Sequence, residues 1–139
     1  MSTEQYKIKT YSPKFAKKTV TVMRKVSQRT FGSLGTDNFD DQVSHFKNVL
    51  AKKYEMRIVT SFNERVIYGV AIFSKTELID LLVDPMKKGL GISTALIDIV
   101  KNQSNGTLSC TTKSRQLADF LQKNGFKPTT HNQFVWQEN

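Results

Sequence analysis

The sequence predicts an α/β fold, in the α+β sense of a mixed, mostly antiparallel sheet flanked by helices, and three observations lead to this prediction. The chain has 139 residues, 38% of them hydrophobic, which suits a single domain spanning residues 1–139. Its middle part is rich in β-branched and aromatic residues, whereas the segments on either side repeat at helical spacing. A glycine-rich turn then leads from a strand into a helix. The expected order of elements is β-α-α-β-β-β-α-β-α-β.

The first part of the chain predicts one strand and two helices. Residues 5–12 alternate Tyr, Ile and Thr with lysines, as an edge strand does. Pro13 then opens a helix. The side chains expected on its buried side are Phe15, Thr19, Val22, Met23 and Val26. After a glycine-containing break, Asp37 or Asn38 caps a second helix that extends to residue 53.

The other side of the first helix is strongly basic. Between residues 5 and 29 there are eight basic residues and no acidic one, in a chain of formal net charge +9. Helical spacing collects one stripe of cations, flanked by Lys17 and Arg24. The stripe consists of Lys14, Lys18, Lys25 and Arg29. It is either a solvated surface or one that attracts nucleic acid or an acidic protein, and its charges are expected to be free to meet a partner.

The rest of the chain predicts a meander of three antiparallel strands, followed by alternating helices and strands. The predicted elements are strands at 55–62, 65–73 and 77–83, a helix at 91–105, a strand at 107–112, a helix at 114–124 and a strand at 133–137. Asn63 and Glu64 are expected to form a tight hairpin. If a helix crosses between them, strand 107–112 must lie parallel to strand 77–83. The phenylalanines and Trp136 are expected in the core.

The turn "DPMKKGLGIST" at residues 84–94 carries the main chemical signal. The free amides of a first helical turn point outward at the positive end of the helix dipole, so such a turn suits a phosphate or diphosphate. Lys87 and Lys88 add positive charge there. Glycines also occur in turns without a ligand, because they adopt positive φ, so the turn alone leaves both interpretations open. Neither a P-loop nor a dinucleotide-binding fingerprint is present.

Two stretches of the chain resemble the GNAT acetyltransferase superfamily. "LLVDPMKKGLGISTALI" is similar to the Q/R-x-x-G-x-G/A acetyl-CoA signature and its helix, and "QLADFLQKNGFKP" is similar to the helix and Gly-Phe corner after the fifth strand. The resemblance covers nearly the whole chain. It implies a GNAT-like fold and an acetyl-CoA-dependent N-acetyltransferase that acts on a primary amine. The residues that it implies for acetyl-CoA are Leu82, Val83, Met86, Lys87, Lys88, Gly89, Leu90, Gly91, Ile92, Ser93 and Thr94.

The chain departs from this family at the usual functional positions. Met86 stands where Gln or Arg is usual, Arg115 where asparagine is common, and Leu121 where a tyrosine protonates the departing thiolate. One interpretation is a divergent enzyme that uses water or another hydroxyl, such as Ser114. The alternative is a catalytically weak or inactive GNAT-like binding module that engages nucleic acid or an acidic protein through its basic first helix.

Acetyl transfer to an amine also needs a group that takes a proton from the ammonium nucleophile. Glu77 and Asp80 are the candidates, with Glu77 preferred; alternation of side chains along a strand allows at most one of them to face the cleft. The alternative is that both are ordinary strand carboxylates. Cys110 has no histidine in register and is interpreted as a small buried residue, and His131 as an exposed loop residue.

Composition also bounds the cofactors and the location. The chain has a single cysteine, and its two histidines lie far apart, so no metal site and no internal disulfide are expected. No apolar run is long enough to cross a bilayer, and the first ten residues are polar. The sequence therefore predicts a cytoplasmic protein without a membrane partner.

Overall fold

Two sheets form the framework of the protein. The computed structural model describes residues 5–26 and 36–139. Its first sheet has four antiparallel strands in the order β1-β2-β3-β4, and its second has three in the order β5-β7-β6. The strands are β1 (Tyr6–Thr10), β2 (Glu55–Ser61), β3 (Ile67–Phe73), β4 (Leu78–Val83), β5 (Thr107–Thr111), β6 (Lys127–Pro128) and β7 (Gln133–Gln137). The predicted meander and the edge position of β1 are confirmed, whereas the short β6 was not predicted.

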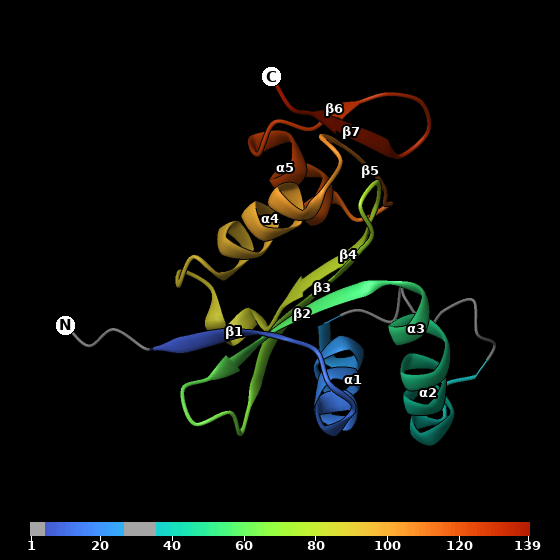
Figure 1. Cartoon of the computed structure of the whole chain (residues 1–139), viewed down its shortest axis with the longest axis vertical. Coiled ribbons are helices and arrows are strands. Elements are labelled where there is room, and N and C mark those ends of the chain that lie inside the picture. Colours follow the sequence, from blue (N-terminus) through green and yellow to red (C-terminus); the bar gives the residue numbers. More distant parts are fainter. Residues whose placement is uncertain (1–4, 27–35) are drawn as a thin grey trace.

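The two sheets meet through a parallel bridge between Glu77, just before β4, and Ser109 in β5. There the Ser109 N–H donates a hydrogen bond of 3.0 Å to the Thr76 carbonyl. The predicted parallel relation between the strands at 77–83 and 107–112 therefore holds at the bridge between Glu77 and Ser109. Beyond it, β4 continues in the first sheet while β5 pairs with β7, and Figure 1 shows the second sheet and α5 (Arg115–Lys123) at one end of the molecule.

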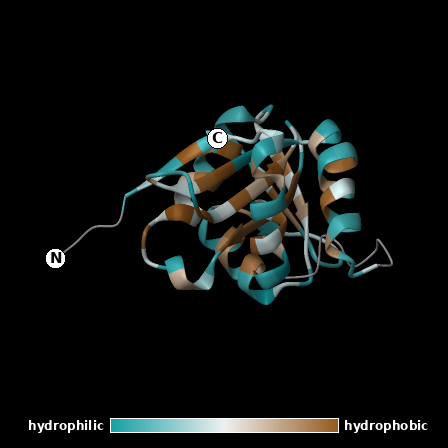
Figure 2. Ribbon diagram, turned by 90° about the horizontal axis from the view of Figure 1, so that it is seen from below, coloured by the Kyte–Doolittle hydropathy of each residue, from teal (hydrophilic) through white to brown (hydrophobic). Residues whose placement is uncertain are grey.

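Helices cover both faces of the first sheet. The remaining helical segments are η1 (Pro13–Phe15), α1 (Ala16–Val26), α2 (Phe39–His45), η3 (Phe46–Leu50), α3 (Ala51–Lys53), η4 (Pro85–Lys87) and α4 (Ile92–Gln103). One core cluster joins α1 and α2 to the sheet, and the other joins α4 and α5 to both sheets. In Figure 2 the hydrophobic residues concentrate on the strands and the inner sides of the helices. Within the described ranges, the helices are too short or too polar to cross a membrane.

The second helix differs from the prediction of one continuous α-helix. Asn38 does cap it, because its side chain accepts a hydrogen bond of 3.0 Å from the Asp41 N–H. Residues Phe46–Leu50, however, form a π-helical turn, in which the Ala51 N–H donates to the Phe46 carbonyl. Phe46 and Leu50 are both buried, so the wider turn lies where the helix packs on the sheet.

The connection between β2 and β3 is longer than the predicted tight hairpin. β2 ends at Ser61 and β3 begins at Ile67. The Ser61 hydroxyl accepts hydrogen bonds from the N–H groups of Arg65 and Val66, at 3.2 Å and 3.1 Å, which satisfies donors that strand pairing would otherwise use. Phe62 in this loop is 60% exposed, so the prediction that the phenylalanines are all core residues is wrong there.

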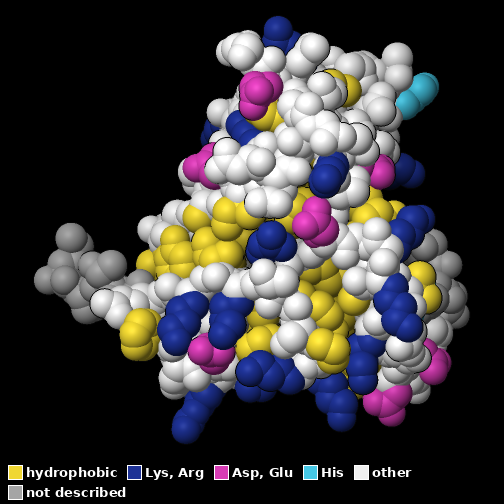
Figure 3. All heavy atoms as spheres, in the orientation of Figure 1, with side chains coloured by type: hydrophobic (Ala, Val, Ile, Leu, Met, Phe, Trp, Pro, Cys, Tyr) yellow, Lys and Arg dark blue, Asp and Glu magenta, His cyan; other side chains and the backbone are white. Residues whose placement is uncertain are grey.

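The first helix has the predicted apolar and basic sides, but Arg24 departs from the prediction. Lys14, Lys17 and Lys18 are exposed, and Figure 3 shows Lys and Arg side chains gathered over this part of the surface. Arg24 is half-buried instead, since its flat guanidinium packs 5.4 Å from the centre of the Phe39 ring.

Two lysines of the basic stripe are also engaged within the protein, contrary to the prediction that its charges are free. The Lys18 ammonium donates to the Arg65 carbonyl at 2.8 Å, and the Lys25 ammonium lies 3.1 Å from a carboxylate oxygen of Asp84. The physical reason is that α1 packs beside β4 and the β2–β3 connection, where these acceptors lie. Arg29 lies outside the described residues.

Candidate functional site

A cleft of about 730 Å³ opens between the end of β4 and α5. Its walls are the end of β4, the glycine turn, the first turn of α4 and one face of α5. The predicted residues that line it are Leu82, Val83, Lys87, Lys88, Gly89, Gly91, Ile92, Ser93 and Thr94. Met86 is 80% exposed and Leu90 is half-buried, and neither lines the cleft.

α5 contributes a wall of the cleft through a different face from the one predicted: Ser114 lines it, whereas Arg115 and Leu121 do not. Ser114, Leu117, Phe120 and Lys123 lie three residues apart, so they share one face of the helix, and all four line the cleft. The other lining residues outside the predicted set are Val26, Leu81 and Gln116. The helical spacing carried this signal, but it does not distinguish a face that packs on the core from a face that borders a cleft.

The glycine turn leaves open space beside its backbone. Gly89 and Gly91 have φ of 88° and 77°, a region that favours glycine. Among the described residues that are not neighbours in the chain, none has an atom within 4 Å of the position that a Cβ would take at either glycine. Gly91 is the N-cap of α4 and has no side chain to accept from the first amides of the helix. The N–H groups of Ile92, Ser93 and Thr94 therefore lack intrahelical acceptors, which suits an anion.

Three lysines surround this turn and the cleft. Lys87 and Lys88 come from the turn, and Lys123 comes from the last turn of α5. The Lys87 ammonium lies 4.6 Å from the centre of the Tyr68 ring, a contact that restrains it beside the turn. The resulting positive charge complements the phosphate groups of a nucleotide.

An acidic residue stands at the base of the same turn. The Asp84 carboxylate accepts from the Met86 N–H at 2.9 Å and pairs with Lys25 at 3.1 Å. The backbone hydrogen bond from Met86, followed by the Lys25 ammonium, lowers the pKa of Asp84 from its ordinary value. Asp84 is therefore ionised at neutral pH and bonded to both α1 and the turn.

The edge of β4 presents main-chain groups to the cleft. The Asp84 N–H donates to the Tyr68 carbonyl of β3 at 2.7 Å. Because successive strand residues point their N–H and C=O groups to opposite edges, those of Val83 point away from β3 and toward the open side. Gly69 of β3 pairs with Val83, and a Cβ on Gly69 would lie 2.7 Å from the Leu82 carbonyl oxygen, so glycine permits this close approach of the strands.

The two candidate bases, Glu77 and Asp80, do not line the cleft. Glu77 is exposed at the bridge to β5, whereas Asp80 is 1% exposed and accepts from the Leu81 N–H at 2.9 Å. Phe73 pairs with Leu78 but Ile72 pairs with Asp80, so Ile79 is an extra residue in β4. This bulge interrupts the alternation of side chains, so regular alternation does not place Glu77 and Asp80 on opposite faces of the sheet.

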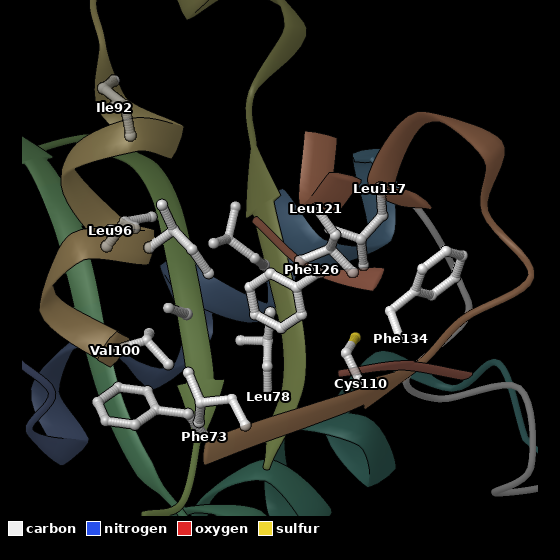
Figure 4. Close-up of a cluster of buried hydrophobic side chains, with 14 of the residues drawn as sticks. Phe73, Leu78, Ile92, Leu96, Val100, Cys110, Leu117, Leu121, Phe126 and Phe134 are labelled. Carbon is white, nitrogen blue, oxygen red and sulfur yellow. The ribbon is translucent and has the colours of Figure 1, made fainter. Parts of the chain in front are cut away.

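The other positions singled out in the sequence separate into buried and exposed residues. Leu121 is 0% exposed, and Figure 4 shows it in the core beside Leu117 and Phe126. Cys110 is buried and His131 is exposed, as predicted. Arg115 is exposed at the start of α5. Among the described residues, no three His, Cys, Asp or Glu side chains are grouped as a metal site would need.

Comparison with known proteins identifies the class to which this arrangement belongs. The family model described as acetyltransferase (GNAT) domain matches residues 16–136. The chain therefore belongs to the GNAT acetyltransferase family, and the resemblance noted in the sequence is confirmed. Among curated proteins no match was found.

Solved structures of GNAT proteins share the fold at low sequence identity. An acetyltransferase of the GNAT family from Staphylococcus aureus Mu50 aligns with a TM-score of 0.72 at 17% identity, over 97% of this chain and 100% of that one. An acetyltransferase from Thermus thermophilus aligns with a TM-score of 0.69 at 14% identity, over 99% of both chains. The PaiA N-acetyltransferase of Thermoplasma acidophilum, solved in complex with coenzyme A, aligns with a TM-score of 0.63 at 15% identity, over 97% of this chain and 99% of that one.

Proposed function

We propose that the protein transfers an acetyl group from acetyl-CoA to a primary amine, and that the cleft beside the glycine turn holds the coenzyme. The observation that carries this proposal is the coincidence of the turn, its free helix amides and its lysines with the open edge of β4. The structure of a GNAT relative with coenzyme A supports the choice of ligand. The cytoplasmic location stays a prediction of the sequence.

In the proposed mechanism the chain acts mainly by positioning its substrates. Acetyl-CoA supplies the activated acetyl group. The amides around Lys88 to Ile92 hold the diphosphate, Lys87 and Lys88 neutralise it, and the Val83 N–H orients the thioester carbonyl. A water takes the proton of the attacking ammonium and can pass it on to Glu77 or Asp80, because neither carboxylate lines the cleft. Leu121 has no proton to donate, so the departing thiolate takes its proton from water or another hydroxyl.

Coenzyme A binding tests this proposal directly. Coenzyme A and acetyl-CoA are expected to raise the thermal stability of the protein, by roughly 2.7 kcal/mol at a hundredfold excess over Kd. Gly91→Asp should abolish the shift, because it places a carboxylate in the open space beside the turn. Gly106→Asp is the matched control, since Gly106 also has positive φ but lies in the turn between α4 and β5. The absence of any shift of the wild-type protein at millimolar ligand contradicts the proposal.

A second candidate function is a binding module with little or no catalysis, which engages nucleic acid or an acidic protein. It is favoured by the exposed lysines of α1 and by the departures at Met86, Arg115 and Leu121. Lys14, Lys18 and Lys25 of the predicted stripe are exposed, together with Lys17 beside it. Lys18 also donates to the Arg65 carbonyl, and Lys25 is paired with Asp84. Binding of coenzyme A separates the two functions, because the binding module does not require it.

A further inference from the structure

We infer that Asp84 is a positioning residue for the glycine turn and that Lys25 of α1 holds it in place, so that the end of the basic helix controls how well the turn binds coenzyme A. This inference rests on the proposed function. It assigns a role in the cleft to two residues that do not line it.

Asp84 links three parts of the molecule through separate bonds. Its carboxylate pairs with Lys25 of α1 at 3.1 Å and accepts from the Met86 N–H of the turn at 2.9 Å. Its main-chain N–H donates to Tyr68 of β3 at 2.7 Å, and its carbonyl accepts from the Lys87 N–H at 2.8 Å. The side chain is only 10% exposed, so these bonds are poorly replaced by water. Loss of the carboxylate frees the first residues of the turn from α1.

The position of these bonds relates them to the cleft. Val26 follows Lys25 in α1 and lines the cleft, as does Lys87 of the turn. The far end of the turn is held separately, since the Tyr6 hydroxyl of β1 donates to the Leu90 carbonyl at 3.3 Å. The turn is thus fastened at both ends, and the Lys25–Asp84 pair fastens the end that leaves β4.

The charge of Asp84 makes the inference testable, because its removal can either raise or lower the affinity for coenzyme A. A carboxylate close to a bound diphosphate repels it, so removing that charge without any change in geometry should tighten binding. A positioning role predicts the opposite result, because the turn loses its link to α1. Asp84→Asn separates the two, since asparagine also caps helical turns but carries no charge to pair with Lys25.

Isothermal titration of coenzyme A measures these effects in wild type, Asp84→Asn, Lys25→Met and the double variant. We expect each single variant to bind about fivefold to tenfold more weakly, as loss of one charge-assisted hydrogen bond implies. The double variant should bind no more weakly than the weaker single variant, because both changes break the same pair. Lys52→Met, which removes an exposed lysine of α3, is the control for net charge and should bind as wild type does.

A second measurement reports on the turn without ligand. The amide resonances of Gly89 and Gly91 in ¹⁵N-labelled protein should shift in Lys25→Met and stay in place in Lys52→Met. If these resonances do not shift in Lys25→Met, the inference is wrong. It is also wrong if Asp84→Asn binds coenzyme A as tightly as wild type or more tightly. Either result leaves the proposed function in place. No binding by the wild-type protein overturns the proposed function and this inference with it.

Discussion

Two adjacent residues of α5 have different environments, one in the core and the other at the cleft. Leu121 is completely buried among the side chains of the α4 and α5 cluster, whereas Phe120 lines the cleft. The family position of the proton-donating tyrosine falls on Leu121 in the sequence, but a hydroxyl placed there is directed into the core. Phe120 is the aromatic residue of α5 that borders the space where a thioester is proposed to lie.

A pair of tyrosine substitutions tests this difference. Leu121→Tyr should lower the free energy of unfolding by about 1–3 kcal/mol, because the larger ring and its hydroxyl overpack a closed core, and it should not raise thiol release. Phe120→Tyr should change the free energy of unfolding by less than about 0.5 kcal/mol, because its hydroxyl reaches the cleft. Urea unfolding gives both free energies, and release of free thiol with a panel of amines gives the activities. Equal stability of the two variants contradicts this assignment of faces.

At the scale of elements, α1 has two separate roles in the structure. Its buried side packs on the first sheet, and its last residues reach the cleft through Val26 and the Lys25–Asp84 pair. The exposed lysines at its start lie on the other side of the helix. A partner that binds those lysines therefore leaves the core contacts of α1 in place.

If the partner of α1 is nucleic acid, its binding should weaken steeply with salt, with log K falling by roughly 0.7 to 0.9 per unit of log salt for each phosphate neutralised. Replacing Lys14, Lys17 and Lys18 by Glu should reduce both the affinity and this slope and should leave coenzyme A binding unchanged. The control replaces Lys47, Lys52 and Lys53, exposed lysines of the second helical segment, and carries the same change in charge. Titrations of DNA and RNA oligonucleotides over a range of salt give these values. Equal binding by the two triple variants, or no binding by wild type at low salt, would mean that the lysines of η1 and α1 form only a solvated surface toward nucleic acid.

At the scale of the whole molecule, ion pairs join segments that are distant in sequence. Glu64 in the β2–β3 connection accepts from Lys9 at 2.7 Å and from Lys7 at 3.1 Å, which ties β1 to this loop. The Lys25–Asp84 pair ties α1 to the end of β4. These pairs lower the pKa of Glu64 from 4.5 to about 2, chiefly through the Lys9 and then the Lys7 hydrogen bond, and they help to lower that of Asp84.

The lowered pKa values predict how stability depends on pH. A carboxylate whose pKa is lower in the folded state stabilises the fold above its unfolded pKa, and that contribution is lost as the pH falls through the folded pKa. The free energy of unfolding should therefore decrease as the pH falls from the ordinary carboxyl range, near 4.5 for Glu64, toward about 2. Glu64→Gln and Asp84→Asn should each make this decrease shallower, as urea unfolding at a series of pH values can measure. An unchanged pH dependence of the free energy of unfolding in both variants would show that these ion pairs do not contribute to the loss of stability at low pH.

The sequence by itself determined the order of the main helices and strands, except the short β6, together with the family and the glycine turn, because these depend on local periodicity and on residue types that stand close together in the chain. A cap at Asp37 or Asn38, of which the structure selects Asn38, and the crossover from β4 through α4 to β5 followed for the same reason. The sequence did not determine which segments contact one another, because periodicity shows which side of an element is apolar but not which element packs against that side.

The tertiary structure alone decided the separation of β4 from β5, the wall of the cleft on α5 and the engagement of Lys25 with Asp84. It also decided that a bulge at Ile79 breaks the alternation between Glu77 and Asp80, and that Leu121 faces the core. Each of these outcomes depends on contacts between residues far apart in the chain. Such contacts arise only when the sheets and helices pack together, so no pattern within one segment could specify them.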